Sequence, residues 1–317
     1  MSETVKGLVI KSTGNVYTLL GEEGRRYTAM VKGEFKLRGL RTTNPVAVGD
    51  HVIMEPSDSA DPDAPGWIVD IAPRTNYIIR RSSNLSKESQ ILGANLDRAV
   101  LIITVNFPYT STTFIDRFLS TAEAYRVPVT LIFNKVDRYR LDEKHDMEML
   151  EALYSGIGYP CFAVSAKSGM GMDQVAEHLS HGVTLLSGHS GVGKSTFINT
   201  LVPGINLRTG EISEAHHTGT HTTTYSEMIP FREGYLIDTP GIKGFGTIDF
   251  EKEQVGHYFP DIFNLSKGCK FSNCTHTHEP ECNVLKALRT GMLARSRYNS
   301  YLSIYNNDED EKYRVGY

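Results

Sequence analysis

A glycine-rich segment that ends in lysine and serine is the first part of the sequence with a clear chemical meaning. Residues 188–195 read GHSGVGKS and match the pattern GxxxxGK[ST]. The apolar run VTLLS, which predicts a strand, precedes them, and the helical pattern STFINTLV follows, which is the setting that the motif requires. Backbone N–H groups at such a helix N-terminus can surround phosphates. The segment therefore predicts a nucleotide-binding P-loop.

Lys194 and Ser195 carry the phosphate chemistry of this motif. A lysine in this position reaches the β- and γ-phosphate oxygens, and the following hydroxyl is a ligand of Mg²⁺. A glycine-rich turn that binds nothing is the alternative, and the flanking strand and helix argue against it. We expect nucleotide contacts along the whole loop and the start of its helix, from Gly188, His189, Ser190, Gly191, Val192, Gly193, Lys194, Ser195 and Thr196.

A second motif, Asn134-Lys135-Val136-Asp137, follows the apolar run PVTLIF. A carboxylate at this point can accept hydrogen bonds from N1–H and the N2 amino group of guanine, and adenine offers neither donor there. A mismatched base would leave buried polar groups unpaired, so such a site rejects it strongly. We therefore expect Asn134, Lys135 and Asp137 to bind guanine, although NKVD alone could be an ordinary turn.

Ser165-Ala166-Lys167 strengthens this interpretation, because it also comes directly after a predicted strand. Its backbone amides could contact O6 of the base. Asp238-Thr239-Pro240-Gly241 ends the apolar run YLI and fits a Walker B position. The Asp238 carboxylate would hold Mg²⁺ through water, and the Gly241 amide would contact the γ-phosphate. DTPG is a common loop by itself, but here it completes a set.

The polar segment 208–224 lies between the P-loop helix and this strand and has the character of a switch loop. Many GTPases orient the attacking water with a glutamine directly after the DxxG glycine, but this chain has Ile242 there. His221 is the best local candidate for that role, and a solvent-facing loop histidine is an equal alternative. Arg208 or a group from a partner is a weaker candidate, so we expect slow hydrolysis without a partner.

A cluster of metal-binding residue types occurs near the C-terminal end of the sequence. Cys269, Cys274, His276 and Cys282 supply three thiols and one imidazole within a short polar stretch. A closed tetrahedral structural Zn²⁺ site uses this set of ligands. His278 is a possible substitute for His276, and buried free cysteines are the alternative. A closed site would stabilise a small domain rather than catalyse.

The elements that position these motifs form three predicted domains. Short alternating strands over residues 1–72 favour a small β-barrel, with the OB-fold as first choice. Residues 73–92 are polar and arginine-rich and suggest a linker. Residues 93–246 alternate strands with helical periods, near 113–126, 142–156 and 172–181, which predicts a doubly wound α/β domain with a largely parallel sheet. Residues 247–317 are expected to form an α-helical zinc-binding domain.

The order of the nucleotide motifs is unusual. Such motifs normally begin with the P-loop, but here NKVD and SAK come first, and the P-loop, the threonine-rich segment and DTPG follow. The predicted site is unchanged, while the chain has been opened at another point. The nucleotide domain is therefore predicted to be circularly permuted, and the DTPG strand leads directly into the C-terminal domain.

Composition places few limits on function. The chain has 317 residues, of which 40% are apolar and 22% charged, as in ordinary globular proteins. The net charge of −4 argues against indiscriminate binding to nucleic acid. No signal sequence or membrane-spanning run is visible, so we expect a cytoplasmic protein without membrane contact. We also expect a monomer. Basic and aromatic residues interleave over 286–305, and basic residues recur over 25–41; each set could face RNA or be a solvated surface.

The motif order, followed by CxxxxCxHxxxxxC and preceded by a small barrel, resembles the RsgA/YjeQ family of small-ribosomal-subunit-dependent GTPases. The resemblance implies GTP and GDP as ligands, action in late maturation of the 30S subunit, contact with its rRNA, and hydrolysis stimulated by that subunit. It also implies that Thr223 holds Mg²⁺, that His221 acts in hydrolysis, and that the four cluster residues bind zinc. Lys194, His221 and Thr223 are thus the candidate catalytic residues. The family motif GRHTTT has Thr220 in place of its arginine here.

Two other functional classes remain open at this point. A nucleotide-gated RNA-binding module would show negligible hydrolysis even with its partner present. An ATP-dependent kinase or ATPase would conflict with Asp137, which is placed for guanine.

Overall fold

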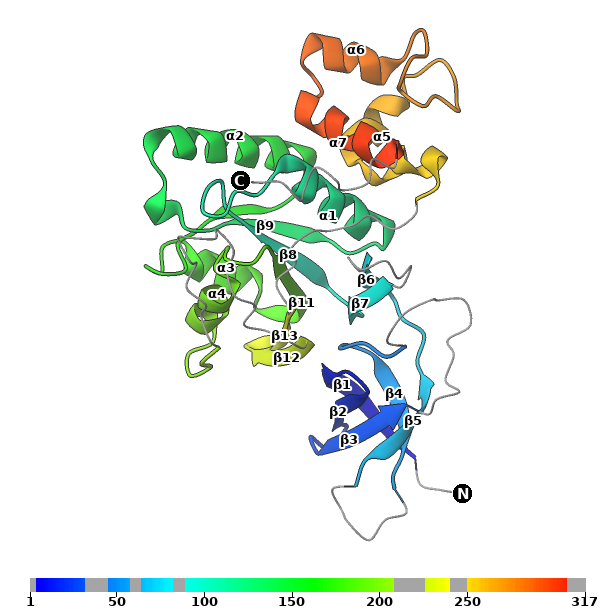
Figure 1. Ribbon diagram of the computed structural model, residues 1–317, viewed down its shortest axis with the longest axis vertical. Coiled ribbons are helices and arrows are strands. Elements are labelled where there is room, and N and C mark those ends of the chain that lie inside the picture. The colour runs from blue at the N-terminus through cyan, green and yellow to red at the C-terminus, as the bar shows by residue number, and fades with distance from the viewer. Residues whose placement is uncertain are drawn as a thin grey trace.

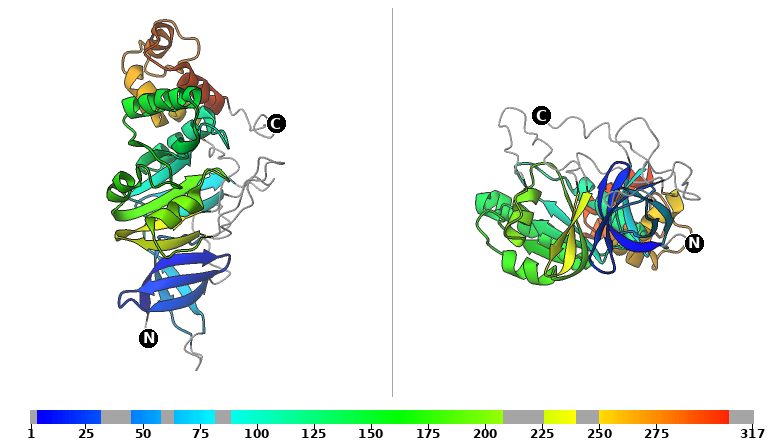
Figure 2. Two further views of the ribbon diagram at one scale, coloured as in Figure 1. Left: turned by 90° about the vertical axis from the view of Figure 1, so that its left-hand side faces the viewer. Right: turned by 90° about the horizontal axis from the view of Figure 1, so that it is seen from below.

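The structure, a computed structural model, describes residues 4–31, 45–57, 64–81, 89–207, 226–239 and 250–306. A barrel, a helix-covered sheet and a group of helices follow one another along the longest axis of the molecule (Figure 1). The same succession is seen from the side in Figure 2. Within these ranges no helix is both long and apolar enough to cross a membrane.

Strands β1 to β5 form the barrel at the N-terminal end. Their bounds are Val5–Thr13, Val16–Gly21, Arg26–Val31, His51–Glu55 and Gly66–Ile71. The strand order is β1-β2-β3-β5-β4, and β1 also pairs with β4, which closes the barrel. Alternation along the strands buries one face, including Tyr17, Leu19 and Ile68. The predicted OB-fold barrel is confirmed.

The central sheet has the order β10-β9-β8-β11-β13-β12. In chain order these strands are Arg98–Ile103 (β8), Val129–Phe133 (β9), Cys161–Ala163 (β10), His181–Gly188 (β11), Ser226–Phe231 (β12) and Glu233–Asp238 (β13). Neighbours are parallel, except for β12 against β13. The strands are mostly apolar because both faces of the sheet are covered.

Helices pack on both faces of this sheet, which confirms the doubly wound fold. They are α1 (Thr112–Ala124), α2 (Leu141–Ile157), α3 (Met172–His178) and α4 (Lys194–Leu201). One core packs residues of α1 and α2 on one face, and a second core packs residues of α3 and α4 on the other. Figure 1 shows the two pairs on opposite sides. Helix α3 ends at His178 rather than near residue 181, because β11 already begins at His181.

Part of the predicted linker is in fact a β-hairpin. Strands β6 (Tyr77–Arg81) and β7 (Ser89–Ala94) pair antiparallel, so the expectation of a polar linker over 73–92 was wrong for these residues. Ile78 and Leu92 of the hairpin are buried in the core beneath α1. In the sequence, Arg80 and Arg81 stand between two short apolar pairs, Ile78-Ile79 and Ile91-Leu92, so the segment looked polar. The domain boundaries at residues 72, 92 and 246 stay predictions.

Several contacts join the barrel to the central sheet. β1 pairs with β12 through Lys11 opposite Glu227, and the two side chains form an ion pair at 3.0 Å. Buried Asp50 of the barrel binds Arg74 with an N–O distance of 2.6 Å. Gly49 has φ +95°, and a Cβ there would lie 2.1 Å from the Ala94 carbonyl oxygen. Only glycine fits this close approach.

The C-terminal part of the described chain is helical, as predicted. It contains a 3-10 helix, Lys252–Tyr258, and helices α5 (Pro260–Ser266), α6 (Asn283–Thr290) and α7 (Arg295–Tyr305). These elements share a small core that includes Phe259, Ile262 and Tyr301. Arg297 of α7 forms an ion pair with Asp116 of α1 at 2.7 Å. This buried pair joins the helical region to the central domain.

The Asp50–Arg74 pair gives a stability prediction. The variant Arg74→Ala would leave a fully buried carboxylate without its cation, which typically costs about 3–5 kcal/mol. We expect a loss of that size in the free energy of unfolding, measured by urea denaturation. The control is Lys11→Ala, whose ion pair is half exposed and should change stability by less than about 1 kcal/mol. Equal effects of the two variants would contradict the prediction.

Candidate nucleotide site and metal centre

The P-loop lies where β11 ends and α4 begins. Lys194 is the first residue of α4, and Gly193 precedes it with φ +96°. A Cβ on Gly193 would lie 2.6 Å from Nδ2 of Asn134, so the loop can approach its neighbour only as glycine. β11 is flanked by the parallel strands β8 and β13. The loop is thus at the carboxyl edge of the sheet, where ligands bind in folds of this class.

Asn134 joins three of the predicted motifs. Its side chain is buried, and Nδ2 donates to the carbonyl of Val192 in the P-loop at 2.8 Å. Its Oδ1 accepts from the backbone N–H of Ala166 at 3.0 Å. The Tyr139 hydroxyl donates to the carbonyl of Asn134 at 2.6 Å and fixes the backbone. The sequence motifs NKVD, SAK and GHSGVGKS are therefore brought together by one amide group.

Lys135 contacts the P-loop in a second way. Its ammonium donates to the Gly191 carbonyl at 2.5 Å and to the Phe107 carbonyl at 2.8 Å. Burial, with a smaller effect of Arg138, lowers the pKa of Lys135 to about 8. Phe107 belongs to the turn after β8, which the sequence motifs did not identify. The signal that was available is its place directly after a buried apolar strand, as with the other motifs.

The two motifs expected at the base differ in exposure. Asp137 and Lys167 are exposed, whereas Ser165 and Ala166 are buried. The N–H of Ser165 donates to the Met170 carbonyl at 3.0 Å, and that of Ala166 donates to Asn134. A base contact through the Ala166 amide would therefore have to replace its bond to Asn134. Asp137 and Lys167 are therefore the side chains of these two motifs that are open to a ligand, and Asp137 is the acidic one.

Lys194 of the P-loop forms a buried ion pair with Asp238 at the end of β13. The adjacent strands β11 and β13 place them together, because Leu186 is in register with Asp238. The Thr239 hydroxyl donates to the Leu186 carbonyl at 2.7 Å. The lysine predicted to bind phosphate and the carboxylate predicted at the Walker B position therefore lie in contact. Ser190, Ser195 and Thr196 are partly exposed along the loop, while His221, Thr223 and Gly241 lie outside the described residues.

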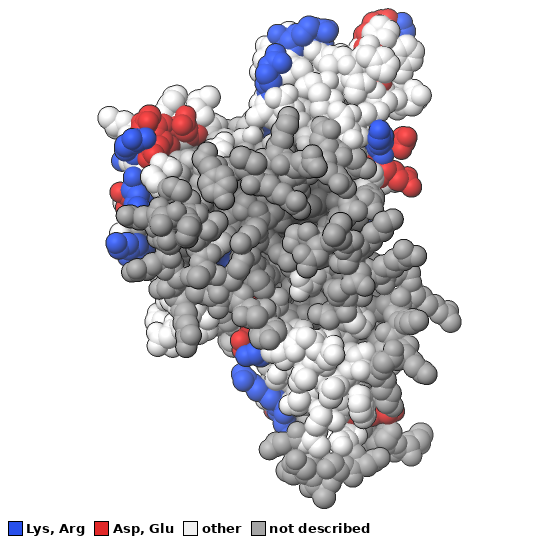
Figure 3. All heavy atoms as spheres, viewed as in Figure 1, with Lys and Arg blue, Asp and Glu red and all other residues white. Residues whose placement is uncertain are grey.

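Basic side chains gather at the outer end of the helical region, where α6 lies (Figure 3). Lys286 and Arg289 of α6 are exposed, as is Arg295 of α7. Arg297, Tyr298 and Tyr301 are instead buried. For these three, the packing alternative holds and the RNA-facing one was wrong. Arg25 and Arg26 of the barrel are exposed, whereas Lys32, Lys36, Arg38 and Arg41 lie outside the described residues.

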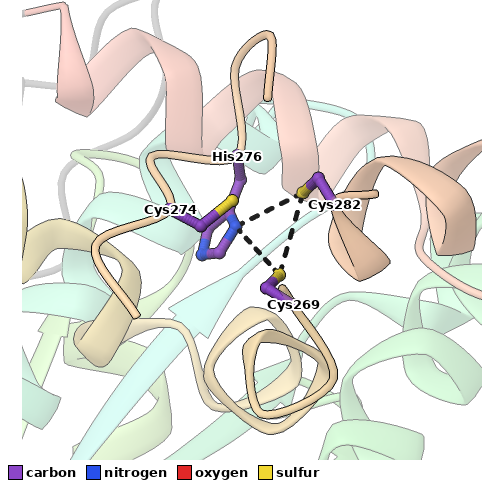
Figure 4. Close-up of side chains that lie close together, drawn as sticks. All are labelled: Cys269, Cys274, His276 and Cys282. Atoms are coloured by element: carbon purple, nitrogen blue, oxygen red, sulfur yellow. Dashed lines mark hydrogen bonds between the residues drawn. The ribbon is translucent and has the colours of Figure 1, made fainter. Parts of the chain in front are cut away.

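The four predicted zinc ligands converge (Figure 4). The ligand atoms of Cys269, Cys274, His276 and Cys282 all lie within 4.8 Å of one another. Cys269 Sγ lies 3.9 Å from Cys282 Sγ and 3.6 Å from His276 Nδ1. With Zn–S near 2.3 Å and Zn–N near 2.0–2.1 Å, a tetrahedron has edges of roughly 3.5–3.8 Å. The cluster therefore has the size and donor set of a zinc site.

Surrounding groups support these ligands. The Tyr298 hydroxyl donates to the carbonyl of His276 at 2.8 Å. Cys282 is the N-cap of α6, and its sulfur accepts from the N–H of Leu285 at 3.4 Å. A helix N-terminus favours a thiolate, but burial is the larger effect here, since it raises the pKa of Cys282 and raises that of Cys274 to about 12. His278 bonds to the Thr277 hydroxyl instead and is not among the four.

Comparison with known proteins identifies the family. The family model described as RsgA GTPase matches residues 71–248, and the family model described as RsgA N-terminal domain matches residues 6–64. The chain is 56% identical over 314 residues to the small ribosomal subunit biogenesis GTPase RsgA of Bacteroides fragilis, covering 99% of this chain and 100% of that protein. It is also 56% identical to the protein of that name from Porphyromonas gingivalis, over 98% and 99% of the two chains.

Solved structures agree with this match over nearly the whole chain. The crystal structure of YjeQ from Thermotoga maritima has a TM-score of 0.73 at 32% identity, covering 96% of this chain and 98% of that one. YloQ, described as a circularly permuted GTPase, has a TM-score of 0.69 at 27% identity, covering 99% and 97%. The predicted permutation is confirmed, and the chain belongs to the RsgA GTPase family.

Proposed function

We propose that this protein binds GTP at the P-loop, hydrolyses it to GDP and phosphate, and acts in late maturation of the small ribosomal subunit. The observation that carries the proposal is the buried amide of Asn134, which holds the P-loop against the motifs for guanine. The relatives named above are small ribosomal subunit biogenesis GTPases, and this supports the ribosomal part. Work on the ribosomal subunit would place the protein in the cytoplasm, and we propose that it acts there as a monomer.

In this proposal the nucleotide residues divide the work by chemistry. Asp137 recognises the guanine edge, and Lys135 covers the base while bonded to the loop. Lys194 binds the β- and γ-phosphate oxygens once it exchanges Asp238 for phosphate. Ser195 and Thr223 would hold Mg²⁺, which neutralises phosphate charge, with Asp238 acting through water. Gly241 would contact the γ-phosphate.

His221 is the proposed residue that orients the attacking water, since Ile242 cannot do so. The ribosomal subunit would complete or order this segment, so hydrolysis without it should be slow. Lys286, Arg289 and Arg295 form an exposed basic surface that suits rRNA phosphates. Binding through phosphates should weaken steeply as salt concentration rises.

Zinc is the proposed metal of the Cys269, Cys274, His276 and Cys282 cluster. Three thiols and an imidazole in a closed group suit a structural ion, because no position is left for substrate. Bound there, the ion would supply cross-linking of the loop to the N-terminus of α6. The role is therefore stability of the helical region rather than catalysis.

The first prediction from this proposed function concerns turnover. We expect purified protein to hydrolyse GTP slowly, and 30S subunits to accelerate this by about 10²-fold or more, the scale of partner-supplied catalytic groups. ATP should not be hydrolysed. Phosphate release is measured with and without subunits, with Lys194→Ala as the inactive reference. His221→Ala should lower the stimulated rate by about 10²-fold or more without changing GDP affinity.

Equal, slow GTP turnover with and without 30S subunits would overturn the ribosome-dependent enzyme. A chain that then binds 30S only with GTP would instead be a nucleotide-gated RNA-binding module. Full stimulated activity of His221→Ala would assign the water-orienting role to another group.

The second prediction concerns base choice. Asp137→Asn removes the acceptor for the guanine N1–H and N2 groups, so GTP affinity should fall by about tenfold or more, and xanthosine triphosphate should bind better than to the unaltered protein. Both are measured by competition against a fluorescent nucleotide. Asp142→Asn is the matched control, because that exposed carboxylate lies in the first turn of α2. Unchanged GTP affinity of Asp137→Asn would refute the assignment.

The third prediction concerns the metal. The protein should contain one zinc ion per chain, and Cys282→Ser should lose it together with much of the stability of the helical region. Structural zinc contributes about 10–16 kcal/mol in small zinc peptides, so a large fall in melting temperature is expected. Metal content is measured by mass spectrometry, with Cys161→Ser, outside the cluster, as control. Zinc retained at full occupancy in Cys282→Ser would contradict the site.

A further inference from the structure

Helix α1 contacts the P-loop at its N-terminal end. The ring of Phe114 lies against the ring of His189 in the P-loop, with centroids 3.7 Å apart and planes at 31°. Phe114 is in the first turn of α1 and is buried. Ser111 caps this turn by accepting from the Phe114 N–H at 3.2 Å. The position of the α1 N-terminus and that of the P-loop are therefore linked by direct packing.

The middle of the same helix is fixed by charge. Asp116 is fully buried, and its Oδ1 accepts from Arg297 Nη1 at 2.7 Å and from the Tyr154 hydroxyl at 2.9 Å. Arg297 also donates to both oxygens of Asp261 in α5, at 2.8 and 3.0 Å. One turn of α1 thus joins α2, α5 and α7. A buried pair with this many partners allows little independent movement of α1.

Arg117 and α7 extend this connection. Arg117 Nη2 donates to the Ser303 hydroxyl of α7 at 3.1 Å. The hydroxyls of Tyr298 and Tyr301 of α7 donate to the carbonyls of His276 and Thr275, respectively. An unbroken series of contacts therefore runs from the metal-site loop through α7 and α1 to the P-loop. Every member is buried or partly buried, where such contacts are little weakened by water.

We propose that α1 is the element through which the helical region sets nucleotide affinity, with Phe114 as the positioning residue of the P-loop and Asp116–Arg297 as the joint. The inference rests on the proposed binding of GTP and GDP at the P-loop. Because Phe114 touches His189 rather than the reacting atoms, it acts on binding and not on the chemical step. By thermodynamic linkage, a change at the joint that shifts α1 changes nucleotide affinity.

The test compares GDP affinity in two matched pairs of variants of the full chain. Phe114→Leu removes the ring contact, and Leu119→Ala weakens the same helix at a buried core position. Arg297→Lys loosens the joint, and Arg74→Lys loosens a second buried arginine–aspartate pair, between the barrel and the hairpin region. Affinity is measured with a fluorescent GDP analogue, and stability of each variant by thermal melting.

We expect Phe114→Leu to weaken GDP binding by about three- to tenfold, the equivalent of one aromatic pair. Arg297→Lys should weaken GDP binding by about fivefold or more. In the double variant Phe114→Leu/Arg297→Lys, the fold-loss of GDP affinity should be smaller than the product of the two single fold-losses. Leu119→Ala and Arg74→Lys should keep GDP affinity within about twofold, the scatter of independent sites. In GTP turnover, Phe114→Leu should raise KM with kcat retained, whereas a merely unfolded fraction would lower kcat at unchanged KM.

The inference is overturned if Phe114→Leu binds GDP no worse than Leu119→Ala, or if Arg297→Lys and Arg74→Lys bind it alike. It is also overturned if Phe114→Leu loses kcat alone, because that result marks a structural role. Where Arg297→Lys does not fold, the Phe114 and Leu119 pair still decides the matter. Absence of GDP binding by the unaltered protein would instead refute the proposed function.

Discussion

The nucleotide site depends on one buried side-chain amide. Asn134 donates to the P-loop and accepts from the Ser165–Lys167 turn, so three segments from distant parts of the sequence share its two polar atoms. Leaving either atom unpaired in this interior would carry the full desolvation cost. The permuted order of the motifs does not matter to this constraint, because the amide requires only that the three loops meet at the carboxyl edge of the sheet.

Asn134 holds three loops together within one domain, and buried ion pairs hold the separate regions of the chain together. Asp50 with Arg74 fixes the barrel to the hairpin region, and Asp116 with Arg297 fixes the helical region to α1. Such pairs give little net stability compared with apolar packing, but they tolerate few alternative arrangements. The barrel, the central domain and the helical region are therefore held in definite positions around the nucleotide site. A conformational change at that site can then move a neighbouring region as a rigid unit.

Local pattern and long-range contact separate what could be predicted from what could not. The P-loop, the guanine motifs, the zinc ligands and the doubly wound sheet follow from short, strongly patterned segments, and the structure brings the described ones together. The hairpin of β6 and β7 was missed because its two short apolar pairs, Ile78-Ile79 and Ile91-Leu92, flank a polar and charged segment. Arg297 looked like an RNA-facing residue, since its partner Asp116 is 181 positions away. No local period reports such a contact.

The pairing of β1 with β12 affects how readily the protein aggregates. β12 is the outermost strand of the nucleotide sheet, and without the barrel its edge groups would be open to pairing with other chains. β1 covers the start of that edge, and Pro230, which has no N–H to offer, lies further along it. The barrel therefore also shields the enzyme against edge-to-edge aggregation, and a nucleotide domain produced without it would carry an exposed strand into solution.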